Sequence, residues 1–398
     1  MVRLSRWAGG HAGLAIIPLA TAMVAPLAAQ QSYGFVVRLG RDTVAMERVR
    51  RSADRLIGDV VERNPGVTIR HYEATLAPDG TVQRFVIDSR PGNPVPGRPA
   101  SQHVELDFRT DSLRAAVGVG DSASVTVYPT GSRLAMPWLT ATYGTSEQLL
   151  LAALKRPGDS IPVTLYLPAG RLAGTVTTFV HRYGRDSASI EYLKTPIMAQ
   201  LDRQGRIASL SGDRTTNKVH LTRLDLPPDI ESIAVRFSAV ETAAGGAVAA
   251  LCPRDTARGT IGAAVLMVDY GRPRLRGRAA IGRLVPLDSV WRTGANEATQ
   301  FRTSMAITLA GTRLEPGLYT LWTELTTSGP TLIVNRQTGQ WGTKYDATQD
   351  LARAPLKAET LATPVEAFTI RIEPTGSTTG KLVMEWDRFQ WTAEIVLK

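Results

Sequence analysis

Cysteine and histidine are scarce in this chain of 398 residues. Cys252 is its only cysteine, which excludes an intramolecular disulfide. After residue 29 the histidines are His71, His103, His181 and His220, which have no metal-ligand spacing. None follows His220, and a nucleophilic cysteine needs a base beside it. We therefore expect no metal site and a Cys252 thiol that is buried or lies in a linker.

Lysine is also rare, with 7 Lys against 39 Arg in a chain of formal net charge +10. The positive charge is spread evenly over the two halves of the chain. It forms no basic block and no basic stripe interleaved with aromatic residues. Nucleic-acid-binding surfaces concentrate basic residues on one face. The distribution therefore argues against a nucleic-acid partner.

Several catalytic motifs are missing as well. The sequence has no Gly-x-Ser-x-Gly elbow, no P-loop and no dinucleotide fingerprint. Beyond the N-terminal leader described next, no stretch is apolar and long enough to span a bilayer. We expect no bound cofactor and no transmembrane segment in the mature chain, and a role without catalysis.

The N-terminus carries the most specific local pattern. Arg3 and Arg6 precede an apolar run over residues 12–27, and Ala28-Ala29 then supply small residues for cleavage. This order is typical of a secretory signal peptide. A membrane anchor is the alternative, but the run is short for one and no stop-transfer flank follows. We predict a signal peptide over residues 1–29 and an exported protein, either periplasmic or extracellular.

Residues 30–242 predict an N-terminal antiparallel β domain with one or two short helices. Short alternating segments are separated by turn residues, and Asp79-Gly80 between two β-branched runs indicates a hairpin. Residues 145–155 favour a helix that is capped near Ser146 and ended by Pro157-Gly158. Residues 49–61 also show helical spacing, although their β-rich flanks weaken that interpretation.

The second half of the chain predicts a separate β domain, since this length suits two domains. Small residues without periodicity follow Ala243, and we expect a linker over residues 243–259. Strands at regular spacing with Gly and Pro turns then predict an antiparallel β-sandwich over residues 260–398. The chain is thus predicted to be mainly β.

This second half also contains an ordered set of motifs. They are L-C-P-R (251–254), V-D-Y-G-R-P (268–273), R-G-R (276–278), V-W-R-T-G-A-N-E-A-T (290–299), P-G-L-Y-T-L-W (316–322), N-R-Q-T-G-Q-W-G-T-K-Y-D (335–346), D-L-A-R (350–353) and E-W-D (385–387). In this order they resemble the bacterial domain of unknown function 2911, over about residues 250–398. Cys252 stands where that family usually has Ser, and Glu315-Pro316-Gly317 departs from its usual turn. The resemblance implies an exported β domain and carries no activity.

The arginines near Gly271 and Pro273 allow two interpretations. Guanidinium groups on a constrained turn can clamp a carboxylate or phosphate through their planar fork. Alternatively, they pair with Asp269, Glu297 or Glu385 of the same domain and hold its two sheets together. The segment 291–297 has the same ambiguity. It is either a recognition motif or a turn formed by Thr293-Gly294 and Asn296 beside a core tryptophan.

Tryptophan is concentrated in the C-terminal half. Trp322 and Trp386 alternate with apolar residues and are expected in the core, whereas Trp341 in a Gly-rich loop is expected to be exposed. An exposed tryptophan can stack on a sugar ring.

We predict a non-catalytic binding or structural module of the cell envelope, whose ligand is an envelope glycan or an anion. The alternative is an envelope hydrolase that uses carboxylates of the C-terminal domain. The candidate ligand-binding residues are Asp269, Arg272, Arg276, Arg278, Trp291, Arg292, Asn296, Glu297, Asn335, Trp341, Tyr345 and Glu385.

Overall fold

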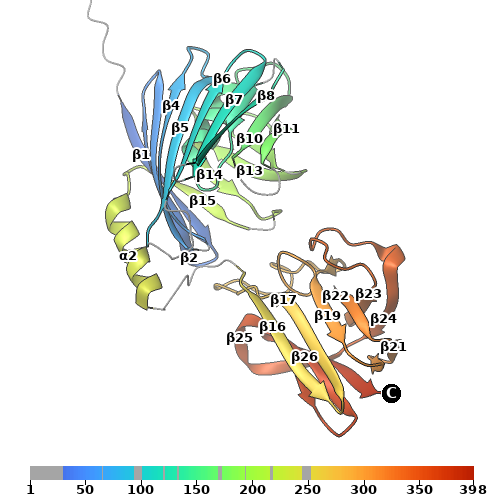
Figure 1. Ribbon diagram of the computed structural model, residues 1–398. Helices are drawn as coiled ribbons and strands as arrows, with labels where there is room; N and C mark the ends of the chain where they lie inside the picture. The colour runs from blue at the N-terminus through green and yellow to red at the C-terminus, as the bar shows by residue number, and fades with distance from the viewer. Residues whose placement is uncertain are drawn as a thin grey trace, which may run out of the picture.

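The computed structural model describes residues 30–64, 66–93, 101–119, 122–131, 134–168, 173–192, 194–215, 218–243 and 252–398. The predicted signal peptide and residues 244–251 of the predicted linker lie outside these ranges. The described chain is mainly β, as predicted, and Figure 1 shows a curved sheet formed by the N-terminal half next to a smaller β structure formed by the C-terminal half. No helix in the described ranges has the length and apolar character needed to cross a membrane.

Fifteen strands form one N-terminal sheet. They run in the order β8-β7-β6-β5-β4-β3-β2-β1-β15-β14-β13-β12-β11-β10-β9. Their bounds are β1 Gln31–Leu39, β2 Asp42–Arg51, β3 Arg55–Arg63, β4 Val67–Leu76, β5 Val82–Pro91, β6 Gln102–Phe108, β7 Ser112–Val119, β8 Ser122–Pro129, β9 Leu134–Pro137, β10 Ser160–Leu167, β11 Gly174–Arg182, β12 Ser187–Tyr192, β13 Thr195–Leu201, β14 Ile207–Ser211 and β15 His220–Leu224. Neighbouring strands are antiparallel except for β9 and β10, which pair in parallel.

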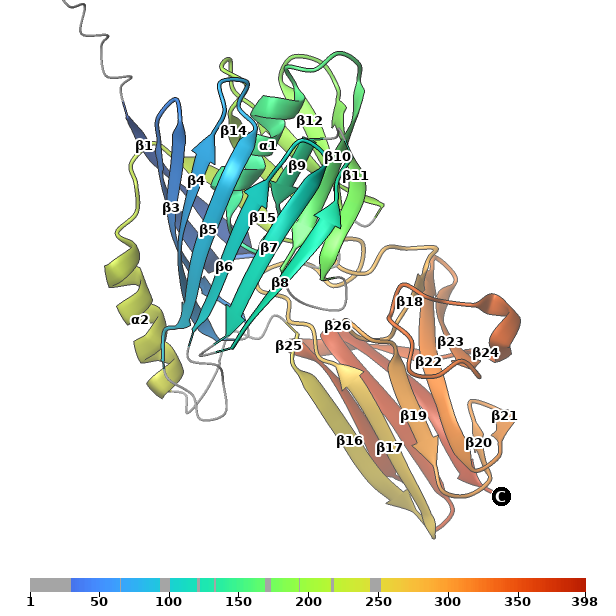
Figure 2. The same ribbon diagram turned by 45° about the horizontal axis from the view of Figure 1, so that its top comes forward.

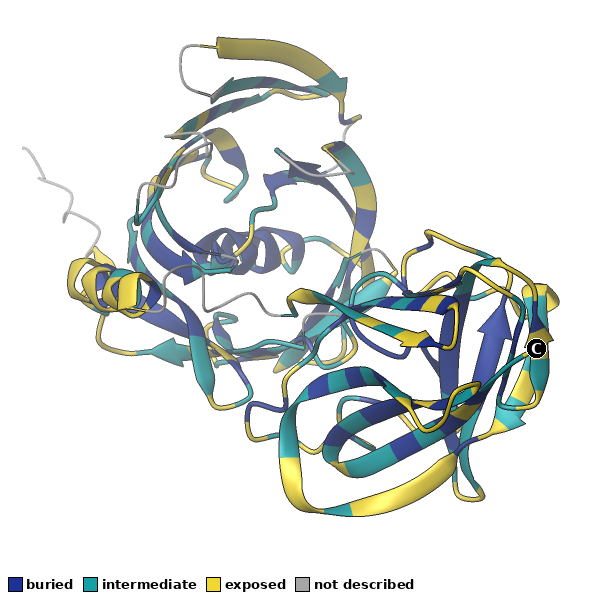
Figure 3. Cartoon of the chain, turned by 60° about the horizontal axis from the view of Figure 1, so that its bottom comes forward, coloured by how far each residue is buried: buried dark blue, intermediate teal, exposed yellow. Residues whose placement is uncertain are grey.

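The hydrophobic pattern explains why this sheet curls around its own core. In β3 and β4 the buried residues alternate with more exposed ones, so one face of each strand is apolar. Those faces meet inside the curve, where they share one large cluster with α1 (Tyr143–Ala153). Figure 3 shows the strands as a ring seen end-on, with a buried helix at its centre. The predicted Asp79-Gly80 hairpin is confirmed, since Ala77 and Thr81 are hydrogen-bonded across the β4–β5 turn.

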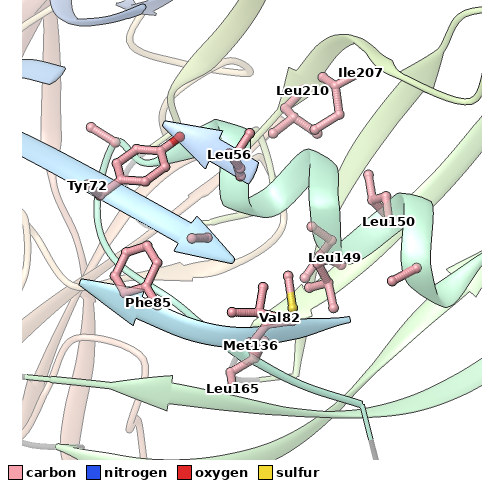
Figure 4. Packing of buried hydrophobic residues seen from close by; sticks show 14 of the residues in the cluster. Leu56, Tyr72, Val82, Phe85, Met136, Leu149, Leu150, Leu165, Ile207 and Leu210 are labelled. Carbon is pink, nitrogen blue, oxygen red and sulfur yellow. The ribbon is translucent and has the colours of Figure 1, made fainter. Parts of the chain in front are cut away.

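Helix α1 is the predicted helix, and its bounds are confirmed to within two residues. The predicted cap is wrong, since the N-cap residue is Thr142, which makes no side-chain capping bond, and Ser146 lies within the helix. Nearly all of its residues are buried, because the sheet surrounds it on several sides. Leu149 and Leu150 belong to the same buried cluster as Leu56 and Phe85 of the sheet, and Figure 4 labels all four. The weaker helical spacing at residues 49–61 belongs instead to β2 and β3, where pairing with neighbouring strands outweighs local periodicity.

Two buried glutamates hold α1 in the sheet. Glu47 of β2 accepts hydrogen bonds from the backbone N–H of Tyr143 at 2.7 Å and from the Tyr72 hydroxyl at 2.7 Å. Glu147 on α1 accepts from the Tyr33 hydroxyl and from the backbone N–H of Ile207. Both carboxyl groups are fully buried, and each is satisfied by donors from several elements.

Helix α2 (Ile230–Ala243) lies on the outside of the same sheet, as Figure 1, Figure 2 and Figure 3 show. Ile230, Ile233 and Ala234 form a small cluster with Val61 and Val67. Most other residues of α2 are exposed or half-buried, so the helix covers a narrow strip of the sheet.

The C-terminal half forms two antiparallel sheets. The seven-stranded sheet has the order β16-β17-β19-β22-β23-β24, with β18 also paired to β22, and the four-stranded sheet has the order β21-β20-β26-β25. Their bounds are β16 Arg254–Ile261, β17 Ala264–Gly271, β18 Val290–Trp291, β19 Thr299–Thr303, β20 Ile307–Leu309, β21 Thr312–Leu314, β22 Gly317–Thr326, β23 Gly329–Asn335, β24 Asp350–Pro355, β25 Lys357–Pro374 and β26 Thr379–Leu397, with a 3-10 turn at Ala347–Gln349. One cluster of buried residues from both sheets forms the core, so this half is the predicted sandwich.

The sandwich begins earlier than expected. Strand β16 starts at Arg254, inside the predicted linker, because residues 254–261 pair with β17 along their whole length. Trp322 and Trp386 are 1% exposed and Trp341 is 36% exposed, which confirms the expectation for each.

The turn between β1 and β2 meets the segment after β17. The backbone N–H of Arg41 donates to the carbonyl of Arg276 at 2.9 Å, and the Arg276 guanidinium forms an ion pair with Asp42. Gly40 has φ near +60°, and a Cβ there would lie 2.2 Å from the Arg276 oxygen. A glycine is therefore required at this contact between the two halves.

Candidate functional site

A cavity of about 340 Å³ lies between the N-terminal sheet and the sandwich. The β14–β15 loop contributes Arg214 and Lys218, and the sandwich contributes Arg274, Arg278 and Arg292. None of the described residues that line the cavity is Asp or Glu. Five cationic side chains therefore line one space, and its described wall contains no carboxylate.

The turn after β17 separates the roles of its arginines. Arg276 has φ near +50°, Gly277 follows with φ near +77°, and the backbone N–H of Arg278 bonds to the Leu275 carbonyl at 3.0 Å. This tight turn points the Arg276 side chain to Asp42, where it is only 5% exposed. Arg278 lies instead on the wall of the cavity.

The segment 291–297 forms the opposite wall. Thr293 and Asn296 both have positive φ, and the Thr299 hydroxyl holds the turn through the Thr293 carbonyl at 2.7 Å. Arg292 donates to the Asn296 carbonyl at 3.2 Å. A Cβ on Gly342 would lie 2.3 Å from the Cδ atom of Arg292, so this glycine leaves room for the guanidinium stem. The turn interpretation of the motif therefore describes the observed backbone, and this turn places Arg292 on the cavity wall.

Arg278 and Arg292 have unusual surroundings for buried or half-buried guanidinium groups. Arg278 donates to the carbonyls of Leu275 and Arg274, and Arg292 donates to a carbonyl alone. Neither forms an ion pair with a carboxylate within the described ranges, although the charge of Asp42 acts on Arg278 and opposes the lowering of its pKa. Burial lowers the pKa of both groups, and for Arg278 the charge of Arg276 lowers it further. The cavity is consequently short of negative charge.

Lys218 shares this environment. Burial lowers its pKa, Asp213 acts in the opposite direction, and Arg278, Arg283 and Arg292 lower it further. Its ammonium donates to the Asp213 carbonyl at 2.9 Å. Mutual repulsion among these cations is what a bound anion would relieve.

Cys252 is half-buried and also lines the cavity. Burial raises the pKa of its thiol, and Arg276, Arg278 and Arg292 oppose that shift. The Asn296 side chain donates to the Cys252 carbonyl at 3.4 Å. A thiol with a raised pKa is a weak nucleophile at neutral pH, but it remains a chemical reporter of this cavity.

Trp291 and Trp386 stack at 5.8 Å between ring centroids and form the apolar floor. Both are largely buried in the sandwich core. The indole N–H of Trp386 has no hydrogen-bond acceptor within the described part of the chain. Trp291 is therefore both a core residue and part of the cavity wall.

The other candidate residues lie outside this cavity. Arg254, on the first strand of the sandwich, pairs with both Asp269 and Glu297 at 2.8 Å and 2.7 Å. Arg272 pairs with Asp255 at 3.3 Å and bonds to Thr369, which links the two sheets. Arg272 thus links the two sheets, as the stapling interpretation predicts, but it pairs with Asp255 and not with Asp269, Glu297 or Glu385.

Asn335 and Tyr345 belong to a network around Asp350. Asn335 is fully buried and donates to Asp350 at 2.8 Å, and the Tyr345 hydroxyl donates to the other oxygen of the same carboxylate. Arg353 joins this network, and burial raises the pKa of Tyr345 to about 12. Trp341 does not join this network in the described contacts, and its backbone forms an isolated bridge with Glu297.

Glu385 forms a two-pronged ion pair with Arg371 at 2.6 Å and 2.9 Å. Arg371 holds the pKa of Glu385 below its usual range. A general acid of a glycosidase needs a raised pKa, so this environment does not suit such a role. Within the described ranges no cluster of three or more His, Cys, Asp or Glu side chains could hold a metal ion.

Sequence reasoning missed Arg214, Lys218 and Arg274. Arg214 and Lys218 belong to a loop of the N-terminal half, and only the fold brings that loop to the sandwich. Arg274 lies between the Gly-Arg-Pro and Arg-Gly-Arg motifs, and this position in the sequence could have indicated that it lies near the same site.

Comparisons with known proteins identify the C-terminal half. Residues 252–395 match the family described as a protein of unknown function, DUF2911, which confirms the predicted resemblance. No curated protein matches the chain. Among solved structures, a DUF1089 family protein from Pseudomonas aeruginosa is 12% identical, with a TM-score of 0.33, over 43% of this chain and 91% of that protein.

Proposed function

We propose that this protein is an exported binding protein that holds an anionic ligand between its N-terminal sheet and its C-terminal sandwich. The observation that supports this function is the cavity with five cationic side chains and no carboxylate in its described wall. Export rests on the leader pattern of residues 1–29.

The proposal follows from the cost of burying charge. A guanidinium group removed from water is stable only when hydrogen bonds or an opposite charge compensate it. Carbonyl groups satisfy some N–H donors of Arg278 and Arg292 but supply no negative charge. A phosphate or carboxylate can accept two parallel hydrogen bonds from each guanidinium. The ligand would therefore provide what the protein wall lacks.

Binding fits this cavity better than catalysis. The thiol in its wall has a raised pKa. Asp269, Glu297 and Glu385 are bound to arginines elsewhere on the sandwich. The cavity volume lies in the range of small-molecule sites, which is about 300–1,000 Å³.

Cys252 allows a direct test, because it is the only cysteine and lines the cavity. We would measure the rate at which N-ethylmaleimide, a neutral reagent, labels the mature chain with increasing inorganic phosphate or acetate. Binding should slow labelling to a saturating limit. Arg278→Met with Arg292→Met should weaken the effect about tenfold or more, since each lost charged hydrogen bond is worth about 1.5–3 kcal/mol.

The matched control is Arg313→Met, because Arg313 lies on β21 outside the cavity lining, is exposed and pairs with Glu315 just after that strand. Its labelling should respond to anions as the wild type does. Equal protection in the double arginine variant and in the wild type would contradict the proposed site.

Export has an independent test. In a bacterium that carries the full chain, mass spectrometry of the envelope and medium fractions should find a protein beginning at Gln30. Recovery of an uncleaved chain from the cytoplasm alone would contradict this part of the proposal.

A further inference from the structure

A second cavity, of about 420 Å³, lies inside the curved N-terminal sheet. The N-terminal end of α1 contributes Tyr143 and Ser146 to its wall, so the helix fills one part of the interior and leaves this part open. Figure 3 shows α1 surrounded by the ring of strands.

The wall of this cavity is mainly apolar and aromatic. Trp138 and Tyr192 stack at 5.6 Å between ring centroids, and Leu167, Leu210 and Leu221 continue the surface. The one charged side chain among the described lining residues is Arg70, which pairs with Glu62 at 2.7 Å. Unlike the cationic cavity, this space offers no uncompensated charge and suits an apolar group.

The two cavities share a lining residue in the β14–β15 loop. Thr215 lines both of them. Within the same loop, Gly212 and Val219 line the apolar cavity, whereas Arg214 and Lys218 line the cationic one. The described residues of this loop therefore line both the apolar cavity and the cationic cavity.

We propose that one ligand occupies both cavities and that it is an anionic head group joined to an apolar chain. The head would pair with Arg278, Arg292 and Lys218, and the chain would extend past Thr215 toward Trp138. This inference rests on the proposed function and names the class of ligand. A fatty-acid carboxylate and an alkyl phosphate share this chemistry, and the test separates them.

Two side chains of the protein can report on ligand binding, one in each cavity. Cys252 reports on the cationic cavity through its rate of labelling. Trp138 lines the apolar cavity and is the only tryptophan between residues 30 and 290. The difference in fluorescence between the wild type and Trp138→Phe isolates its contribution from that of the other tryptophans.

The probes are acetate, octanoate, decanoate and dodecanoate, with inorganic phosphate, dodecyl phosphate and neutral 1-decanol beside them, all below micelle-forming concentrations. Dodecanoate should slow Cys252 labelling and change Trp138 fluorescence with one shared concentration dependence. From octanoate to dodecanoate, affinity should rise about fourfold for each methylene, the equivalent of about 0.8 kcal/mol. Whichever head group binds more tightly at equal chain length identifies the source.

Other results would overturn the inference in distinguishable ways. Equal protection of Cys252 by acetate and dodecanoate, with no change at Trp138, would support the anion site but contradict an apolar chain in the second cavity. A response of Trp138 without protection of Cys252, or binding of 1-decanol as tight as that of the anions, would contradict the inference that one ligand occupies both cavities. No response to any anion at either reporter would contradict the proposed function as well.

A variant sharpens the same test. Ile197 is half-buried and lines the apolar cavity but not the cationic one. The larger side chain of Ile197→Phe should therefore narrow the apolar cavity. We expect the dependence on chain length to shrink while protection of Cys252 by inorganic phosphate remains. Circular dichroism would establish that the variant is folded, and an unchanged dependence on chain length in a folded variant would contradict the placement of the chain.

Discussion

The interior of the N-terminal sheet and the cavity between the two halves differ in how their buried charges are compensated. Glu147 is fully buried but has donors from Tyr33, Ile207 and Arg223. Arg292 is also removed from much of the solvent but bonds to a carbonyl alone. The protein itself supplies the partners of the Glu147 charge. In our account a ligand supplies the negative charge that Arg292 lacks. Where a protein leaves charge uncompensated indicates where it binds.

The largest effect is expected at Glu147. Glu147→Ala would leave Arg223, which is 11% exposed, without its carboxylate, and would release one anchor of α1. Breaking one side of a buried ion pair typically lowers the free energy of unfolding by about 3–5 kcal/mol. Urea denaturation would measure the change. Glu105→Ala, which breaks the surface pair with Arg84, serves as the control, and an equal loss in both variants would contradict the contrast.

Glu47 predicts a pH dependence. Burial raises its pKa to about 8, with a smaller contribution from the charge of Glu147, although Tyr72 and the α1 backbone donors oppose the shift. The folded chain therefore keeps this proton where the unfolded chain has released it. Between about pH 4.5 and 8 the free energy of unfolding should fall as pH rises, by up to about 1.4 kcal/mol for each pH unit.

The variant that checks this slope is Glu47→Gln, which has no proton to release. Its unfolding free energy should vary less with pH across the same range than that of the wild type. A slope identical to that of the wild type would assign the pH dependence to other groups.

The contact between the halves should show an intermediate effect. Asp42→Ala removes the ion pair with the buried Arg276, and a hydrogen bond to a charged group is worth about 1.5–3 kcal/mol. Calorimetry should show the two halves unfolding at more widely separated temperatures. Glu315→Ala, on the surface of the sandwich, should leave the two transitions where they were. A single shared transition in the Asp42 variant would indicate coupling through other contacts.

The smallest effect is expected in the cationic cavity without ligand. Arg292→Met removes a desolvated charge that has no acidic partner in the described chain, so stability should remain within about 1 kcal/mol or increase. Arg371→Met breaks a two-pronged pair with Glu385 and should lower stability. A clear loss in the first variant, measured by thermal unfolding, would show that Arg292 serves the fold.

The sequence predicts much of the fold because local patterns govern strands, turns and α1. It also offers Asn296 as a turn residue, and Asn296 has the positive φ that this residue type tolerates in turns. It cannot separate Arg276 from Arg278, because Asp42, the partner of Arg276, lies far away in the sequence. Glu47 likewise resembles a surface residue of a strand until the sheet closes around α1. Long-range pairing decides which charges are compensated, and spacing along the chain does not record it.

The most direct test measures thermal unfolding of the wild type and of the Arg278→Met, Arg292→Met double variant, with and without phosphate at constant ionic strength. Phosphate also stabilises proteins generally by exclusion from their surface, so the difference between the two chains is the informative quantity. Our account predicts a double variant that is as stable as the wild type without phosphate and gains less from it. A double variant that is less stable without phosphate, yet gains as much from it, would contradict the account.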